Sequence, residues 1–145
     1  MDQITKTLME FFEGTAQAFT DGQFERAAKS WKIPNTVHAG EHKLFLSSYK
    51  DLENILTVYR RNLAVEDYAR TSVEVLQCIK DKSGVVQALV HWTNFNSKGA
   101  EINTLDASYF CRLGADFRWH IETIELVSHP SARFSDGMPF YRLGK

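Results

Sequence analysis

The feature that most constrains the fold is a run of four long strand-like segments in the second half of the chain. They are rich in Val, Ile, Thr and aromatic residues, and they span Tyr68–Lys80, Val85–Asn96, Glu101–Leu113 and Phe117–Val127. Only short stretches of turn-forming residues separate them, such as Asp81-Lys82-Ser83-Gly84. Connections of this length are too short for the crossover that parallel neighbours need. The sequence therefore predicts one antiparallel meander.

Side-chain alternation along these segments predicts which face of the sheet is buried. The apolar positions are the even ones from Val86 to Trp92 and the odd ones from Leu105 to Leu113, which should therefore face the core. Asp106, His91 and His120 fall on the opposite parity. In the last segment the apolar positions change from odd (Phe117, Trp119, Ile121) to even (Ile124, Leu126). A similar slip of the apolar alternation follows Val75. Such slips are typical of β-bulges in a strongly bent sheet.

The first half of the chain predicts helices and a small hairpin. A stripe from Ile4 to Phe19 indicates a helix that ends near Asp21-Gly22, and Phe24–Trp31 indicates a shorter one. Two short strands follow, Asn35–Ala39 and Lys43–Leu46. A capping-box start at Ser48 then begins the clearest helix, whose apolar stripe runs from Leu52 to Leu63. Helices packed against a curved sheet leave an apolar pocket between the two layers.

Composition predicts one domain and excludes several classes of partner. The 145 residues are 43% hydrophobic and 24% charged, as in ordinary globular proteins, and they predict a single domain over residues 1–128. An irregular tail over residues 129–145 is apolar enough to cover a sheet edge or a neighbouring subunit. Lys and Arg (17) balance Asp and Glu (18), so no nucleic-acid partner is predicted. No apolar run approaches a membrane span of about 18 residues, and the start lacks a signal-peptide pattern, so we expect a cytoplasmic protein with no membrane role.

The sequence predicts neither a metal nor a cofactor. Its five histidines show no ligand spacing, and it has no phosphate-binding or dinucleotide-binding glycine motif and no nucleophile elbow. Cys78 and Cys111 lie singly inside apolar strands, which predicts buried, reduced thiols.

Three local motifs, taken in order, resemble one superfamily. They are Phe19-Thr20-Asp21-Gly22-Gln23-Phe24, the stretch from Ser30-Trp31 to Val37-His38, and the hairpin Leu113-Gly114-Ala115-Asp116-Phe117-Arg118-Trp119-His120-Ile121. With the order of helices and strands from Ile4 to Val127, they resemble the nuclear transport factor 2-like (NTF2-like) superfamily, which includes SnoaL-like and ketosteroid-isomerase-like proteins. The resemblance implies an α+β fold in which a curved antiparallel sheet, a cone or cystatin-like roll, wraps around N-terminal helices. It also implies a cavity for small hydrophobic molecules and a homodimer packed through the sheets.

The resemblance does not select a function, because the superfamily contains isomerases, cyclases, dehydratases, epoxide hydrolases and non-catalytic members. Ketosteroid isomerases need a carboxylate base, a tyrosine and a protonated acid. Approximate alignment puts His38 or Ala39 at the base, Thr15 at the tyrosine, and Ser108 or Tyr109 at the acid. None of the three required residue types is retained, which excludes isomerase chemistry of that form.

Two residues remain as catalytic candidates. His38 could move a proton at neutral pH, although alternation with an inward Val37 would turn it outward. Tyr109 lies on the apolar face of its strand and could donate a hydrogen bond into a cavity. The residues predicted to line the pocket are Thr15, Trp31, Tyr49, Trp92, Asn94 and Trp119. Of these, Asn94 either meets solvent at the end of the sheet, the interpretation we favour, or contacts a ligand.

Two functions stay open at this point. One is a small-molecule-binding domain that catalyses a cofactor-free isomerisation, cyclisation or dehydration of a hydrophobic substrate. The other is a non-catalytic dimeric module, with a cavity filled by its own side chains, that binds another protein. An open cavity of about 300 Å³ or more, the lower end of usual ligand pockets, would favour the first.

Overall fold

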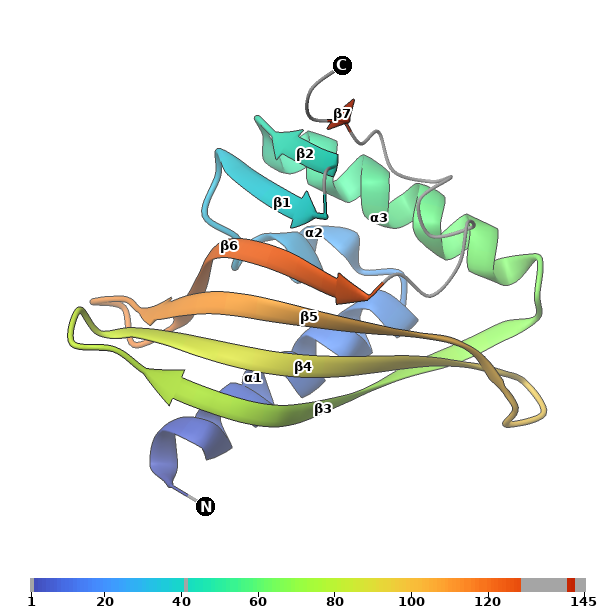
Figure 1. Ribbon diagram of the computed structural model, residues 1–145. Helices are drawn as coiled ribbons and strands as arrows, with labels where there is room; N and C mark the ends of the chain where they lie inside the picture. Colours follow the sequence, from blue (N-terminus) through green and yellow to red (C-terminus); the bar gives the residue numbers. More distant parts are fainter. Residues whose placement is uncertain (1, 41, 129–140, 143–145) are drawn as a thin grey trace.

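The computed structural model describes residues 2–40, 42–128 and 141–142. Within them the chain forms the helices α1 (Gln3–Thr20), α2 (Phe24–Ala28) and α3 (Tyr49–Ala64). The strands are β1 (Asn35–Ala39), β2 (His42–Leu46), β3 (Tyr68–Lys80), β4 (Val85–Asn96), β5 (Glu101–Leu113), β6 (Trp119–Ser128) and β7 (Tyr141–Arg142). They make one sheet in the order β3-β4-β5-β6-β1-β2-β7 (Figure 1).

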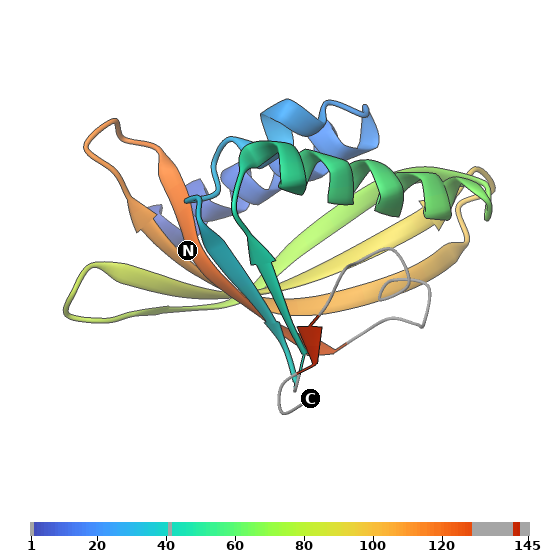
Figure 2. The same ribbon diagram turned by 90° about the horizontal axis from the view of Figure 1, so that it is seen from above.

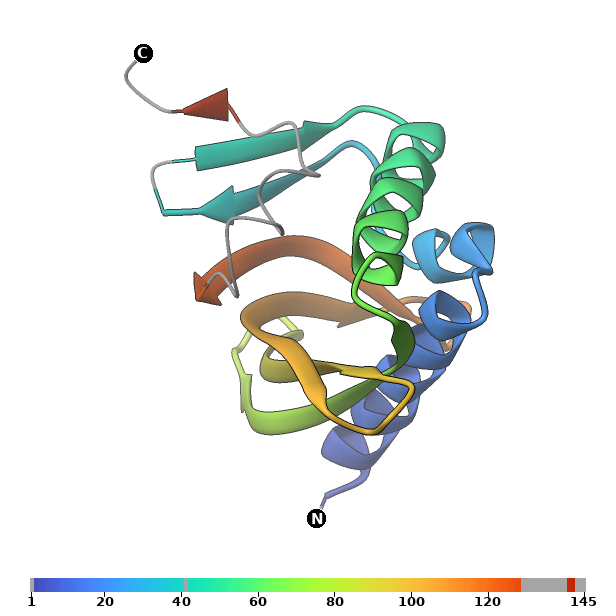
Figure 3. The same cartoon turned by 90° about the vertical axis from the view of Figure 1, so that its right-hand side faces the viewer.

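The predicted α+β class and the curved sheet are confirmed. The three helices lie on one side of the sheet, which bends toward them without closing (Figures 2 and 3). Strands β3 to β6 pair as an antiparallel meander. The β1–β2 hairpin joins them through parallel pairing of β1 with β6, in which Val37 lies opposite Ile124 and His38 opposite Glu125, so the sheet is not antiparallel throughout.

The predicted bulges are confirmed in both strands. In β3 the register shifts between Val75 and Gln77, so Leu76 has no partner of its own on β4. In β6 it shifts between Ile121 and Thr123, which leaves Glu122 as the extra residue. Each bulge lies where the apolar alternation slips, because the extra residue returns the next apolar side chain to the inner face.

Most of the apolar side chains that alternation places on the inner faces of β4 and β5 are buried, whereas two predicted positions nearby are exposed. Val90, Ala107 and their inner-face neighbours are buried against α1 and α3. Leu113, however, is 48% exposed, because it is the last residue of β5 before the turn. Phe117 is 87% exposed and lies in that turn with a left-handed φ of 61°, so the prediction that it belongs to the inner face of β6 is wrong.

Helix α2 is three residues shorter than its apolar spacing predicts. The backbone around Trp31 leaves the helix and pairs with β6: Lys32 N–H donates to the Ile121 carbonyl at 2.8 Å, and Ile121 N–H donates to the Ser30 carbonyl at 2.9 Å. A sheet partner from a distant part of the sequence thus replaces the last turn of the helix. This arrangement brings Trp31 to the edge of the space between helices and sheet.

Helix α3 begins as predicted, with Ser48 as the N-cap whose side chain accepts from Asp51 N–H at 3.1 Å. The predicted tail lies outside the described residues except for Tyr141 and Arg142, which pair with the free edge of β2 and so cover part of a sheet edge. None of the helices in the described part of the chain is long and apolar enough to cross a bilayer.

Candidate functional site: a cavity between helices and sheet

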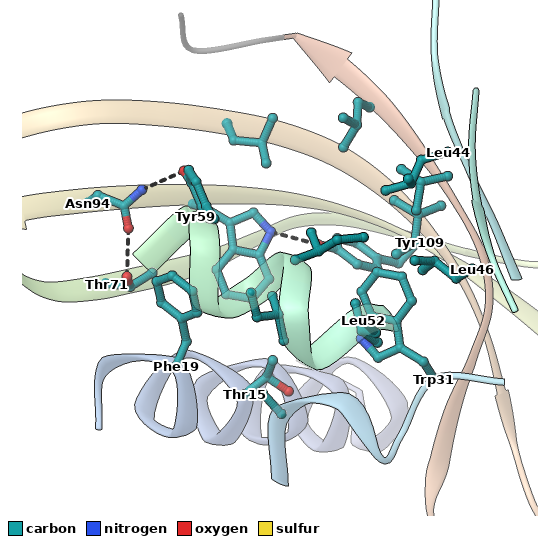
Figure 4. A pocket seen from close by; sticks show the side chains of 18 residues that line it. Thr15, Phe19, Trp31, Leu44, Leu46, Leu52, Tyr59, Thr71, Asn94 and Tyr109 are labelled. Carbon is teal, nitrogen blue, oxygen red and sulfur yellow. Dashed lines mark hydrogen bonds between the residues drawn. The ribbon is translucent and has the colours of Figure 1, made fainter. Parts of the chain in front are cut away.

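A cavity of about 140 Å³ lies between the inner face of the sheet and the helices. Among the described residues, 18 side chains line it, and they come from all three helices, from strands β1 to β6 and from the segment after α2 (Figure 4). Its volume is less than half of the roughly 300 Å³ at which usual ligand pockets begin, so the size set above as favouring the small-molecule function is not reached. It is close to that of apolar cavities of about 150 Å³ that bind benzene. The space therefore suits a molecule of about one ring.

The lining is almost entirely apolar. Its described side chains include no Asp, Glu, His, Lys or Arg. Leu44, Leu46 and Leu52 lie around Trp31 at one end, while Tyr59, Thr71 and Asn94 gather at the other (Figure 4). The cavity thus has an apolar end and a polar end.

Asn94 is the centre of the polar end. It is only 3% exposed, so the favoured interpretation that it meets solvent is wrong. Its amide nitrogen donates to the Tyr59 hydroxyl at 3.1 Å and to Asn103 Oδ1 at 2.8 Å, and its carbonyl accepts from the Thr71 hydroxyl at 2.6 Å. Both amide hydrogens and the amide oxygen of Asn94 are therefore engaged inside the protein.

The network continues outward from Thr71. The Thr71 hydroxyl donates its one hydrogen to Asn94. In the hydrogen bond between the Tyr68 and Thr71 hydroxyl oxygens, which lie 2.5 Å apart, Tyr68 must therefore be the donor. Thr71 N–H donates to Thr20 Oγ1 at 3.1 Å, and Thr20 in turn donates to the Ala16 carbonyl at 2.9 Å. These bonds join the end of α1 to β3, β4 and α3, and so hold the helices at a fixed distance from the sheet.

Tyr109 lies nearer the apolar end of the cavity and, unlike Asn94, makes a single hydrogen bond with the described residues. Its hydroxyl accepts from Trp92 Nε1 at 3.0 Å, and its ring centroid lies 4.9 Å from that of Phe12. Burial raises the pKa of Tyr109 above its ordinary value, and it raises the pKa of Tyr59 to about 12. Both phenols therefore stay protonated at neutral pH and can act as hydrogen-bond donors rather than as bases.

Five of the residues proposed from the sequence lie together around the cavity: Thr15, Trp31, Trp92, Asn94 and Tyr109. The Thr15 hydroxyl donates to the Phe11 carbonyl of its own helix at 3.1 Å. Trp92 and Tyr109 share the inner face of neighbouring strands, as their parity predicts.

Three other proposed residues lie outside the cavity lining. His38 is exposed on the outer face of β1, opposite Lys43 and Glu125, because Val37 and Ala39 take the inward positions. Tyr49 is 45% exposed, and its hydroxyl donates to the Trp31 carbonyl at 3.0 Å. Trp119 is buried, but its Nε1 donates to Thr7 near the start of α1, at 3.2 Å.

With this geometry in place, a family model described as an NTF2-like protein (DUF6841) matches residues 2–130. The chain belongs to this NTF2-like family. Among curated protein sequences, none matches it. Solved structures match this NTF2-like chain at identities that support the fold alone.

Three of these structures illustrate the likeness. A domain of unknown function with a cystatin-like fold from Nostoc punctiforme has a TM-score of 0.67 at 14% identity, covering 94% of this chain and 84% of its own. Aln2 from a Streptomyces species has a TM-score of 0.69 at 11% identity, and the match covers 87% of this chain and 91% of Aln2. A ketosteroid isomerase-like protein from Erwinia carotovora atroseptica has a TM-score of 0.58 at 9% identity, and the match covers 89% of this chain and 100% of that protein's chain.

Two polar side chains of the NTF2-like cavity, Thr71 and Tyr59, are not among the lining residues predicted from the sequence. Thr71 shares the parity of Val73 and Val75, so the inner face of β3 would have included it. Tyr59 belongs to the apolar stripe of α3, but nothing in the sequence indicated that its hydroxyl meets Asn94 across the cavity. The first could have been found by extending an alternation, whereas the second depends on the packing of a helix on the sheet.

The outer face of the NTF2-like sheet carries the acid and the histidine that parity places away from the core. His91 and Asp106 are cross-strand partners there, with Nδ1 and Oδ1 2.5 Å apart. Among the residues that the structure describes, no group of three or more His, Cys, Asp or Glu side chains could hold a metal ion.

Proposed function

We propose that this NTF2-like chain binds a small, mostly apolar molecule of about one ring in size in the cavity between helices and sheet. The observation that carries the proposal is an apolar space lined from every described helix and from six strands, with the buried phenols of Tyr59 and Tyr109 among its walls. Desolvation of an apolar ring in such a space is favourable without any charged partner. A structural neighbour whose name is ketosteroid isomerase-like agrees with a small-molecule role for this fold.

The lining favours binding over proton-transfer catalysis. A cofactor-free isomerisation, cyclisation or dehydration needs a group that accepts a proton near neutral pH. The part of the wall that the structure describes offers no carboxylate or imidazole, and the pKa of Tyr59 is raised to about 12 by burial. Such chemistry here would need water or the substrate itself to accept the proton. His38 does not contribute, because its side chain is exposed on the outer face of the sheet and not in the cavity.

The binding proposal is tested by titrating ethylbenzene into the ¹⁵N-labelled protein and following backbone amide chemical shifts. We expect saturable shifts at residues around the cavity. Ala27→Leu, which adds a larger side chain to the lining, should weaken binding by about tenfold or more, since it fills space that the ring needs. Ala64→Leu makes the same change at an exposed position at the end of α3 and should leave the affinity unchanged. Absence of saturable shifts, or equal affinities of the two variants, would reject the proposal.

We also propose that a second copy of the chain packs on the outer face of the sheet. No described helix covers this face, where Leu89 and Phe110 are half-buried and Val127 is exposed. A protein-interaction role, the alternative function, would use the same face. Light scattering at micromolar concentration should give the mass of a dimer, and Leu89→Lys should give a monomer. A monomer mass for the unaltered chain would contradict this proposal. The cytoplasmic location stays a prediction.

A further inference from the structure

We propose that the cavity selects an uncharged ligand with one hydrogen-bond acceptor, such as a ketone, ester or ether oxygen, and that Tyr109 is the residue that selects it. This inference rests on the proposed function, because it requires that a small molecule binds in the cavity. It adds the chemical class of that molecule and the side chain that recognises it.

The hydrogen bonds of Tyr109 are incomplete. A phenol has one hydrogen to donate and lone pairs to accept with. Trp92 Nε1 fills an accepting position at 3.0 Å. For the hydroxyl hydrogen itself, the described residues offer no acceptor within hydrogen-bond distance. A buried hydrogen without an acceptor is unfavourable, so a ligand oxygen that accepts it would be held more tightly than a carbon in the same place.

The other polar groups of the described lining already have partners. The Tyr59 hydroxyl interacts with the side chains of Asn94 and Asn103. Asn94 donates both amide hydrogens, to Tyr59 and to Asn103. The hydroxyl of Thr71 donates to Asn94, and that of Thr15 donates to the backbone of α1. A ligand acceptor placed at the polar end would have to break one of these hydrogen bonds. Beside Tyr109 it would instead accept the hydroxyl hydrogen that has no other acceptor among the described residues.

The charge of the ligand follows from the same walls. A carboxylate or an ammonium group would lose its hydration on entry, and no Lys, Arg, His, Asp or Glu among the described lining residues could compensate. Burial keeps Tyr109 protonated by raising its pKa, so the phenol offers a hydrogen and not a negative charge. An alcohol would satisfy Tyr109 but would bring a second hydrogen that needs its own acceptor.

Four probes of nearly equal size test this inference: ethylbenzene, acetophenone, 1-phenylethanol and phenylacetate. We expect acetophenone to bind the unaltered protein about tenfold more tightly than ethylbenzene, as one buried hydrogen bond allows. 1-Phenylethanol should be weaker than acetophenone, and phenylacetate should bind least. In Tyr109→Phe the advantage of acetophenone over ethylbenzene should disappear, because acetophenone weakens while ethylbenzene keeps its affinity. Tyr49→Phe, the same change outside the cavity, should preserve the advantage.

The outcomes separate this inference from the binding proposal on which it rests. Ethylbenzene and acetophenone binding equally well to the unaltered protein would reject the inference and leave the binding proposal standing. An unchanged preference in a folded Tyr109→Phe variant would do the same. No binding of any probe would reject both. If Tyr109→Phe does not fold, the ranking of the four probes on the unaltered protein decides alone.

Discussion

Replacing Asn94 with leucine is expected to lower the free energy of unfolding by about 2–4 kcal/mol, because it removes the three hydrogen bonds of a buried amide and leaves their partners without a replacement. The groups affected are the Thr71 hydroxyl, the Tyr59 hydroxyl and Asn103 Oδ1. Leucine has the same branching as asparagine and is the closest apolar match to its shape, so the loss reports on hydrogen bonding more than on packing. Urea denaturation followed by far-ultraviolet circular dichroism measures it.

A matched variant and a double mutant sharpen this test. Asn54 is exposed on α3, and Asn54→Leu should change stability by less than about 0.5 kcal/mol. Thr71→Val should be much less damaging in the Asn94→Leu background than alone, since its acceptor is already gone. Equal stabilities of Asn94→Leu and Asn54→Leu would show that the network contributes nothing to holding the helices on the sheet.

Phe12→Ala is expected to lower the free energy of unfolding by about 3–5 kcal/mol, the usual cost of deleting a buried aromatic ring. Phe12 is fully buried on α1, and its ring centroid lies 4.9 Å from that of Tyr109 and 6.1 Å from that of Trp92. Because those two residues are walls of the cavity, the vacated space adjoins it. The variant should therefore bind naphthalene, which the unaltered cavity is too small to hold.

Phe11→Ala is the control for this prediction. Phe11 neighbours Phe12 on the same helix but is only half-buried, so its loss should cost clearly less. It should not create naphthalene binding either. A similar loss of stability in both variants, or naphthalene binding in neither, would contradict the position assigned to Phe12.

The strands could be predicted closely because their signals are local. Turn residues mark where each strand of the meander ends, and the slip of the apolar phase in β6 locates its bulge within two residues of Glu122. The residues whose observed positions differ from the predicted ones are placed by contacts or turns that the local apolar pattern does not show. Trp31 leaves α2 because its backbone meets β6, and Phe117 turns outward because it belongs to the hairpin turn.

The site could be predicted only in part, for the same reason. Parity on β4 and β5 predicts that Trp92 and Tyr109 face the helices, and the structure places both in the cavity wall. It cannot predict that Asn94 would be enclosed by α3 through Tyr59, since that depends on where the helix crosses the sheet. Nor can it predict the size of the cavity, because large side chains such as Phe12 occupy much of the space between the layers.

The most direct test of the central claim, that the cavity binds a small apolar molecule, is a crystal structure of the protein soaked with iodobenzene. The account predicts an anomalous iodine peak between α3 and the inner face of the sheet, among the side chains that line the cavity and within reach of Tyr109. A well-ordered cavity that stays empty at saturating probe, or iodine peaks only on the outer surface, would contradict it.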